Sequence, residues 1–464
     1  MRTTNLLLVF FLAVALLVGF LISQYPPTIL IWVTLAFAIF TITFVKFEWG
    51  LYILIFSMLL SPEINVGETA GSSLGRGVTL RAEDFLLAVI GLSWFAKTAV
   101  NKDLGLFLKT PLNKPIFFYV LACIVSTGMG IAFGEVNAKT SSLFILKYVE
   151  YFIVFFMVAN QIEDTDQISR LVFCLFLTCF ITSIIGILQI PGGERVSAPF
   201  EGERGEPNTL GGYLLFIGAV AAGLLIKSED SKLKLQLWLL LSGIILPFLF
   251  TQSRSSYLGL IPVCLILGLL TKRRAVIFGL MAIILISSPL ILPSQVKNRI
   301  IFTFKQPEAT GQVSIGSVRL DTSTSARLAS LEEILIDWPK HPIIGYGITG
   351  YKFADAQYPR VLIETGILGL LAFFYLLYSI FRLAIDHLKA LKTPYFKGLT
   401  IGFIAGFTGL LFHAVGANTF IIVRIMEPFW FFVGIIAVLP AIERKSVTQP
   451  QENGSKIRGL ASVN

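Results

Sequence analysis

The stretch LLLVFFLAVALLVGFLISQYPPTILIWVTLAFAIFTITFV, residues 6–45, decides the fold. It holds two uncharged apolar runs, 6–23 and 28–45, with a short polar joint between them. At about 1.5 Å per residue, each run of about eighteen residues can cross the hydrocarbon core of a bilayer. A signal peptide has a shorter apolar core and is not followed at once by a second span. We therefore predict a helical membrane protein whose first helix is 6–23.

The whole chain has the composition of a membrane protein. It has 464 residues, of which 55% are hydrophobic and only 14% charged, whereas soluble domains are about 25% charged. We predict an all-α integral membrane protein, with one domain over 1–442 and a disordered cytoplasmic tail over 443–464. About 12–14 transmembrane helices are expected, near 6–23, 28–45, 49–61, 84–99, 115–134, 142–161, 168–190, 209–227, 235–251, 257–271, 274–292, 361–385, 398–420 and 426–442.

The positions of the basic residues predict the orientation. With both termini in the cytoplasm, almost every strongly basic joint falls on the cytoplasmic side, as the positive-inside rule requires. This distribution also accounts for the net charge of +9 without a nucleic-acid partner. The acidic joint around Glu163 is assigned to the same side, because acidic residues contribute little to the rule. The joints predicted outside that matter for function are 62–83, 191–208, Ser253–Ser256 and 293–360.

The long outer segment 293–360 contains one strong helical pattern. In SARLASLEEILIDW, residues 325–338, the apolar residues recur at helical spacing, which predicts an amphipathic helix on the membrane surface. A residue between Thr322 and Ser325 is expected to cap it, and Pro339 and Pro342 follow its end.

Several charged residues are candidates for binding or catalysis. Arg254 lies in an outer turn, where it can act as a phosphate clamp or as an interfacial arginine whose side chain reaches water. Arg327 lies on the predicted surface helix, and Arg319 and Arg360 are weaker candidates that also fit plain surface charge.

Other polar residues have a structural and a functional interpretation. Asn208 can cap a helix or help to bind an anion at the helix N-terminus. Lys147 and Glu150, three residues apart within a span, fit a structural ion pair better than a transport site. The Asp164-Thr165-Asp166 triplet is too short a match to indicate a metal site, and neither a metal nor a cofactor is expected.

Three segments together carry a family resemblance. They are EPNTLGGYLLFIG (Glu206–Gly218), FTQSRSSYLGL (Phe250–Leu260), and the stretch from Arg327 through DWPKHPIIGYGITGYKF to VLIETGILGLLAFF. The last contains the order Arg, His-Pro-x-x-Gly-x-Gly and Glu-x-Gly-x-x-Gly. Over about 200–440 the sequence resembles the O-antigen ligase and O-antigen polymerase superfamily of bacterial membrane glycosyltransferases.

The resemblance implies an inverting, metal-independent enzyme that transfers a saccharide from an undecaprenyl-diphosphate carrier on the outer face of the bacterial cytoplasmic membrane. Arg254 and Arg327 match the two essential arginines of the family, which bind the diphosphate. The family often has His-Asn where this chain has Asp355-Ala356, so Asp355 becomes the candidate general base and His341 the fallback. The residues expected to bind substrate are Pro207, Asn208, Ser253, His341, Tyr358, Arg360 and Glu364.

The acceptor separates the two activities of the superfamily. A polymerase extends a carrier-linked chain, as in exopolysaccharide or lipopolysaccharide synthesis, whereas a ligase transfers to a glycolipid core. The missing histidine favours a polymerase. One alternative is a transporter or a flippase for lipid-linked glycans, which the large helix count and the Lys147–Glu150 pair also fit. A third option is a non-catalytic partner in a membrane assembly.

Overall fold

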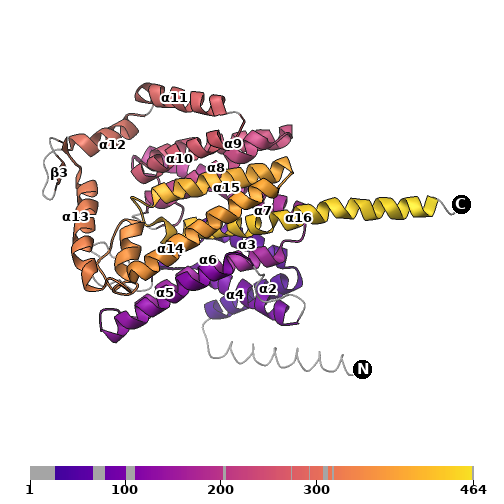
Figure 1. Cartoon of the computed structure of the whole chain (residues 1–464), viewed down its shortest axis with the longest axis horizontal. Helices are drawn as coiled ribbons and strands as arrows, with labels where there is room; N and C mark the ends of the chain where they lie inside the picture. Colours follow the sequence, from indigo (N-terminus) through magenta and orange to yellow (C-terminus); the bar gives the residue numbers. More distant parts are fainter. Residues whose placement is uncertain are drawn as a thin grey trace.

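The computed structural model describes residues 27–65, 79–100, 110–201, 205–272, 274–291, 293–306, 312–315 and 318–461. The predicted first helix, 6–23, lies outside these residues. Most of the described chain forms a bundle of helices whose axes run roughly side by side (Figure 1). In chain order the helices of the bundle are α2 (Pro27–Val45), α3 (Phe47–Leu60), α4 (Ala82–Val100), α5 (Asn113–Ala132), α6 (Ala138–Gln161), α7 (Thr165–Gln189), α8 (Pro207–Lys227), α9 (Ser231–Phe250), α10 (Arg254–Leu269), α11 (Arg274–Ile291), α14 (Gln357–Ala390), α15 (Pro394–His413) and α16 (Val423–Ala461).

The remaining elements are short and lie in the joints. Two antiparallel pairs form, β1 (Glu63–Asn65) with β2 (Thr79–Arg81), and β3 (Ser314–Ile315) with β4 (Val318–Arg319). The segment between α11 and α14 also contains α12 (Ser294–Lys305) and α13 (Thr322–Asp337), and three single 3-10 turns are η1 (Ile190–Gly192), η2 (Trp338–Lys340) and η3 (Thr419–Ile421).

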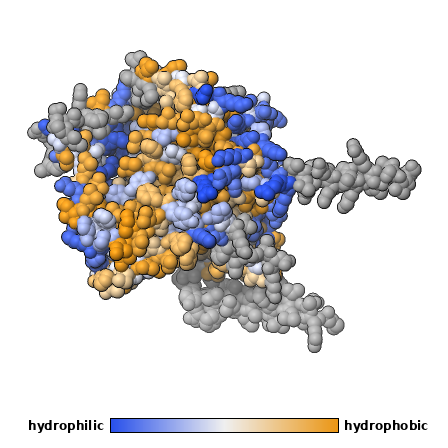
Figure 2. Space-filling view, in the orientation of Figure 1, coloured by the Kyte–Doolittle hydropathy of each residue, from blue (hydrophilic) through white to orange (hydrophobic). Residues whose placement is uncertain are grey.

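The length and exposure of the helices agree with a membrane location. Within the described part of the chain, eight helices are long and apolar enough to cross a bilayer, and four shorter apolar helices accompany them. Large apolar side chains such as Trp32, Phe117 and Phe173 are half exposed or more on the outside of the bundle. Figure 2 shows an apolar band between polar margins at the two ends. The predicted all-α integral membrane fold is therefore confirmed.

The joints gather at two ends of the bundle, as the alternation of the predicted spans requires. The loop end carries the described residues within 190–206, 293–356 and 414–422, and α13 lies across it (Figure 1). The tail end, where α16 projects away, carries the joints around 162–164, 228–230 and 391–393. At the tail end Arg170 forms an ion pair of 2.8 Å with Glu48, so the acidic joint before α7 lies on the same side as Lys46.

The core of the bundle packs α8, α15 and α16 together through aromatic side chains. The ring of Phe216 lies 6.0 Å from that of Phe403 and 5.6 Å from that of Phe429, centroid to centroid. These three side chains are fully buried, and offset aromatic contacts at such distances stabilise buried cores. The packing fixes the ends of α8, α15 and α16 relative to one another at the loop end.

One local prediction differs from the structure. The cap of α13 is Asp321, one residue before the predicted range, and its side chain accepts a hydrogen bond from the Thr324 N–H. Carboxylates are strong caps, so Asp321 takes precedence over the hydroxyl residues that follow it. The last helix, α16, is drawn to Ala461, and the disorder of the tail over 443–464 stays a prediction.

Candidate functional site

The centre of the candidate site is an ion pair between the start of α10 and the start of α13. Both terminal nitrogens of Arg254 donate to the carboxylate of Asp321, each at 2.8 Å. The Asp321 side chain is almost fully buried, with 1% of it exposed, and that of Arg254 is 20% exposed. This fork-to-carboxylate geometry is the strong form of an arginine ion pair. It joins two segments that are 67 residues apart in the sequence.

Asp321 also orients the second predicted arginine. As the cap of α13, Asp321 fixes the position of the first turns of the helix, on which Arg327 lies. Burial lowers the pKa of Arg327. The negative charge of Asp355 raises this pKa, and the positive charge of Arg254 lowers it further. Burial alone would raise the pKa of Asp321, but its hydrogen bonds from Arg254 and Thr324 lower it to about 2. Arg254, Asp321, Arg327 and Asp355 therefore act on one another in one site.

Two arginines that we did not predict complete the group. Burial lowers the pKa of Arg195 to about 10, and the nearby positive charges of Arg299, Arg254 and Arg327 contribute to this shift. Burial and the charge of Arg254 likewise lower the pKa of Arg299 on α12. We call Arg195, Arg254, Arg299 and Arg327 the arginine cluster. Its members repel one another, so the cluster favours an anion among them.

The arginine cluster retains hydrogen-bond donors for such an anion. The Nε atoms of Arg299 and Arg327 are buried and have no hydrogen-bond partner among the described residues. Arg195 instead donates to the backbone carbonyls of Thr251 and Gln252, at 2.9 and 3.3 Å. This contact holds Arg195 beside the turn that carries Arg254. Arg195 and Arg299 lie in joints predicted to be outside, where the positive-inside rule disfavours basic residues. The same signal singled out Arg254 and could have identified these two arginines.

The first two sequence motifs meet directly beneath the cluster. The Ser253 hydroxyl donates to Oδ1 of Asn208 at 2.7 Å, and Ser253 caps α10 by accepting from the Ser256 N–H. A Cβ at Gly211 would lie 2.2 Å from Oγ of Ser256, so only glycine permits this approach of α8 to α10. The proposed cap role of Asn208 is wrong, because the cap of α8 is Glu206 and Pro207 is its first residue.

Four predicted residues lie in a second polar layer at the same end. Arg360 and Glu364 are buried and paired at 3.1 Å within α14, so the surface-charge interpretation of Arg360 is wrong. The burial follows from the early start of α14 at Gln357, which places Arg360 inside the bundle rather than in a loop. His341 pairs with Glu135 at 3.3 Å, and the Tyr358 hydroxyl donates to the Leu411 carbonyl at 2.7 Å. The contacts of these four residues are made within this layer rather than with the arginine cluster.

The third motif forms a turn that docks on a break in α14. Gly366 has a φ of +63°, which interrupts the helix. The break frees the N–H groups of Ile367 and Leu368, which donate to the carbonyls of Pro342 and Ile343 at 2.9 and 3.2 Å. The glycines of this motif thus have a structural role, and the turn leads into Asp355, an exposed residue next to Arg327.

Two cavities lie away from the arginine cluster. One of about 800 Å³ lies near the tail end and is lined by residues of α7 and α9, including Phe176 and Leu237. Another of about 430 Å³ lies between α5 and α14 and is mostly apolar. The Asp164–Asp166 triplet lies at the tail end, where Asp164 caps α7 by accepting from the Gln167 N–H.

Part of the chain matches a known protein family. The model of the O-antigen ligase family matches residues 237–374. This match contains Arg254, Arg299, Asp321, Arg327 and Asp355, whereas Asn208 and Arg195 precede it. No curated protein matches the chain significantly. Over this segment the chain is similar to the O-antigen ligase family, which supports its resemblance to the O-antigen ligase and O-antigen polymerase superfamily, and its apolar helices make it a multi-pass membrane protein.

Proposed function

We propose that the chain is a membrane glycosyltransferase that takes its saccharide from an undecaprenyl-diphosphate carrier. The observation that carries the proposal is the arginine cluster, where, among the described residues, four guanidinium groups lie with the two carboxylates of Asp321 and Asp355. This excess of about two positive charges complements the two negative charges of a diphosphate diester. The family match supports the same class of reaction.

The Arg254–Asp321 pair suggests how the diphosphate is bound. A phosphate offers two oxygens to a guanidinium fork in the same way as a carboxylate does. Asp321 holds the Arg254 guanidinium in one orientation through NH1 and NH2, so a phosphate would contact its other edge, and Arg327 supplies a second guanidinium from α13. The buried Nε donors of Arg299 and Arg327 are further groups that an anion would satisfy.

The chemistry follows from the charges. When the bond between the anomeric carbon and the diphosphate breaks, negative charge grows on the leaving oxygen, and the arginine cluster stabilises it. An acceptor hydroxyl attacks from the opposite face, which inverts the anomeric configuration. Asp355 takes the proton of that hydroxyl as general base. We propose that no metal is required, because guanidinium groups provide the charge stabilisation.

We propose further that the loop end faces the outside of the bacterial cytoplasmic membrane and that both termini are cytoplasmic. The acceptor is a saccharide or a glycolipid. We favour a polymerase over a ligase because Asp355 stands where many relatives have histidine. The second candidate, a transporter or flippase, is favoured by the charged residues buried between α4, α6 and α16.

The test is an assay of purified protein in lipid vesicles with a synthetic undecaprenyl-diphosphate oligosaccharide. Glycan length, carrier release and the anomeric configuration of the product are followed, with and without EDTA. The variants are Arg254→Ala, Arg327→Ala and Asp355→Asn. Arg319→Ala is the matched control, because Arg319 is an exposed arginine on the same long loop.

Longer glycans that depend on Arg254 and Arg327 support a polymerase, and carrier release only with an added core glycolipid supports a ligase. Full activity in either arginine variant contradicts the assigned site. Loss of turnover with EDTA contradicts the metal-free mechanism. Movement of the lipid-linked glycan across the vesicle membrane without any transfer supports the transport alternative.

A further inference from the structure

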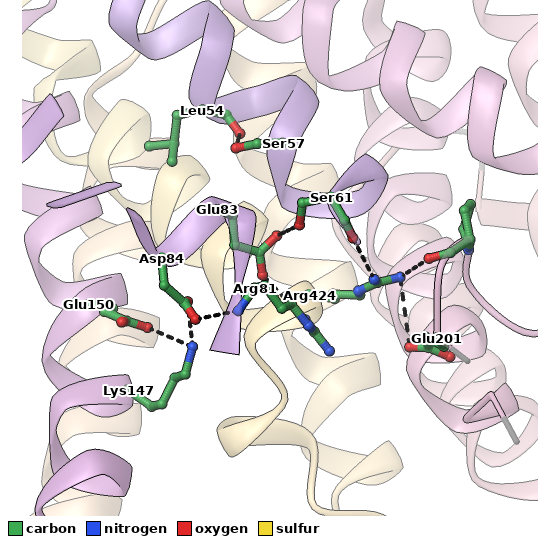
Figure 3. Close-up of polar contacts among 11 residues, drawn as sticks. Leu54, Ser57, Ser61, Arg81, Glu83, Asp84, Lys147, Glu150, Glu201 and Arg424 are labelled. Carbon is green, nitrogen blue, oxygen red and sulfur yellow. Dashed lines mark hydrogen bonds and ion pairs between the residues drawn. The ribbon is translucent and has the colours of Figure 1, made fainter. Parts of the chain in front are cut away.

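A second group of charged residues is buried where α4, α6 and α16 meet. Lys147 on α6 lies between two carboxylates, Asp84 on α4 and Glu150 one turn further along α6 (Figure 3). Lys147 donates to Asp84, and its Nζ lies 3.4 Å from Oε2 of Glu150. The predicted Lys147–Glu150 pair is therefore present, but Asp84 is the closer partner. Asp84 also accepts from the Arg81 backbone N–H at 2.7 Å.

The neighbouring carboxylates are paired as well. Glu83 is fully buried and accepts from the Ser61 hydroxyl at 2.5 Å and from the Arg81 guanidinium at 3.3 Å. Glu201 lies 3.9 Å from Arg424 at the start of α16 and accepts from the Glu206 N–H at 2.8 Å. Each of these carboxylates thus has a cation or an N–H donor beside it (Figure 3).

Arg424 is committed to several partners besides Glu201. Its terminal nitrogens donate to the backbone carbonyls of Pro199 and, at 3.1 Å, of Ser61. Its side chain is fully buried. These contacts leave Arg424 tied to the loop before α8 and to the end of α3.

Glu427, one turn after Arg424 on α16, is different. It is fully buried, and neither of its carboxyl oxygens has a hydrogen-bond partner among the described residues. The charged groups that act on it are Glu83 and Asp84 from α4 and Glu150 and Lys147 from α6. Three of these four are carboxylates, so the net field at Glu427 opposes a further negative charge.

The excess of carboxylates over cations around Glu427 also disfavours a negative charge on its carboxyl group. Among the described residues, this group holds three cations and five carboxylates, and we call it the carboxylate cluster. Its cations are Arg81, Lys147 and Arg424, and its carboxylates are Glu83, Asp84, Glu150, Glu201 and Glu427. A buried charge without a partner is strongly unfavourable, and a carboxyl in that position takes up a proton instead.

We propose that Glu427 is the proton-binding residue of this buried site and that it is a neutral carboxylic acid at pH 7. The proton converts a carboxylate without donors into a group that fits its apolar surroundings. A metal ion fits less well, because the ammonium group of Lys147 already occupies the space between Asp84 and Glu150, and no suitable group of three metal-binding side chains lies among the described residues.

Protonation has a consequence for the packing of the bundle. Loss of the proton would place a carboxylate of α16 against Glu83 and Asp84 of α4 and Glu150 of α6, with only Lys147 to oppose them. The three helices would repel one another at this point. Since the folded state holds a proton that the unfolded state releases, the stability of the protein falls as pH rises through the range where Glu427 ionises. The inference rests on these buried charges and not on the proposed transfer reaction.

The experiment is infrared spectroscopy of the purified full-length protein in lipid. We expect wild-type protein at pH 7 to show the C=O band of a buried carboxylic acid, and Glu427→Gln to lose it. Glutamine has the shape of the protonated acid, so this variant is expected to fold. Glu333→Gln is the matched control, because Glu333 is 54% exposed and pairs with Lys352, and the band should remain.

Thermal unfolding between pH 6 and pH 10 provides an independent readout. Wild-type protein should lose stability relative to Glu427→Gln as the pH rises. A carboxylic acid band of unchanged intensity in Glu427→Gln overturns the proposal. The absence of the band in wild-type protein also overturns the proposal. If, in that case, Na⁺ but not choline stabilises wild-type protein and does not stabilise Glu427→Gln, the site binds a small cation instead of a proton.

Discussion

The arginine cluster and the carboxylate cluster lie at the same end of one bundle, yet their charges are opposite. Counting the described residues, the first has four guanidinium groups and two carboxylates. In the second, five carboxylates lie with three cations. Among the described residues, the first has buried Nε donors without a hydrogen-bond partner on Arg299 and Arg327, and the second has a carboxyl group, that of Glu427, with neither oxygen hydrogen-bonded.

This difference indicates what each group can bind. Unpaired N–H donors that repel one another are stabilised by an anion, whereas unpaired carboxyl oxygens are stabilised by a proton. Position strengthens the distinction. The arginine cluster lies on loops and helix starts that a substrate can reach, and Arg254 is partly exposed. Glu427 and Arg424 lie fully inside the bundle. Substitutions in the first should therefore affect activity, and substitutions in the second should affect stability.

The largest effect is expected for Lys147→Met. It removes the cation shared by Asp84 and Glu150 while keeping the length of the side chain. Removing one partner of a buried pair costs about 3–5 kcal/mol of stability. Unfolding in detergent, followed by circular dichroism, measures this loss. Glu427→Gln is the matched variant and should lose no stability at pH 7, because its side chain is neutral in the bundle without taking up a proton. Equal losses in the two variants would remove the distinction between paired and unpaired carboxyls.

Arg254→Ala should have the next largest effect, and on activity. Loss of one group that stabilises developing charge lowers kcat by about 10²–10³-fold. Arg254→Lys should remain well below wild type, because an ammonium group cannot form the bidentate contact with Asp321 or a phosphate. Initial rates of carrier release measure both. If lysine restores full activity, charge alone is sufficient and the fork geometry is not needed.

Much of the fold was predictable from the sequence. The lengths of the apolar runs gave the positions of most helices to within a few residues, because the thickness of the bilayer restricts a span so strongly. Periodicity also gave α13. Its cap at Asp321 was missed because hydroxyl residues follow directly and also favour this role.

The arrangement of charges was less predictable. Arg254, Arg327 and Asp355 were found from their order in the sequence, but Arg195 and Arg299 have no motif of their own. They join the site only because distant loops fold back to the turn that contains Arg254. Similarly, Lys147 and Glu150 are neighbours on one helix, but Asp84 and Glu427 reach them from two other helices. Local spacing predicts contacts within an element and says little about contacts between elements.

A smaller effect is expected for Asp321→Asn, which acts through Arg254. The variant keeps the size of the side chain but loses the charge that orients the guanidinium, and we expect transfer to fall about ten-fold, within the range for misplaced catalytic groups. Rates and thermal stability should be compared with wild type. The matched control is Asp337→Asn, because Asp337 is a carboxylate at the other end of α13.

The same pair predicts a pH dependence. The pKa of Asp321 is lowered to about 2 in the folded protein, below the usual value of about 3.9. Its contribution to stability is therefore complete above about pH 4 and is lost as the pH falls through about 2. The difference in stability between wild type and Asp321→Asn should be constant from pH 8 to pH 5 and should decrease below about pH 4. A difference that already changes between pH 7 and pH 5 would contradict the strong pair.

The smallest effect is expected for Arg195→Gln and Arg299→Gln. Arg195 donates to backbone carbonyls and Arg299 acts on Asp321 through its charge, so each should add to the attraction of the anion rather than to its precise orientation. A loss of about 1 kcal/mol of uniform binding raises KM about five-fold and leaves kcat nearly unchanged. Arg319→Gln, in the same long loop but exposed, should change neither constant. If Arg195→Gln lowers kcat as much as Arg254→Ala does, the cluster acts as one catalytic unit, and the separation between orienting and attracting arginines does not hold.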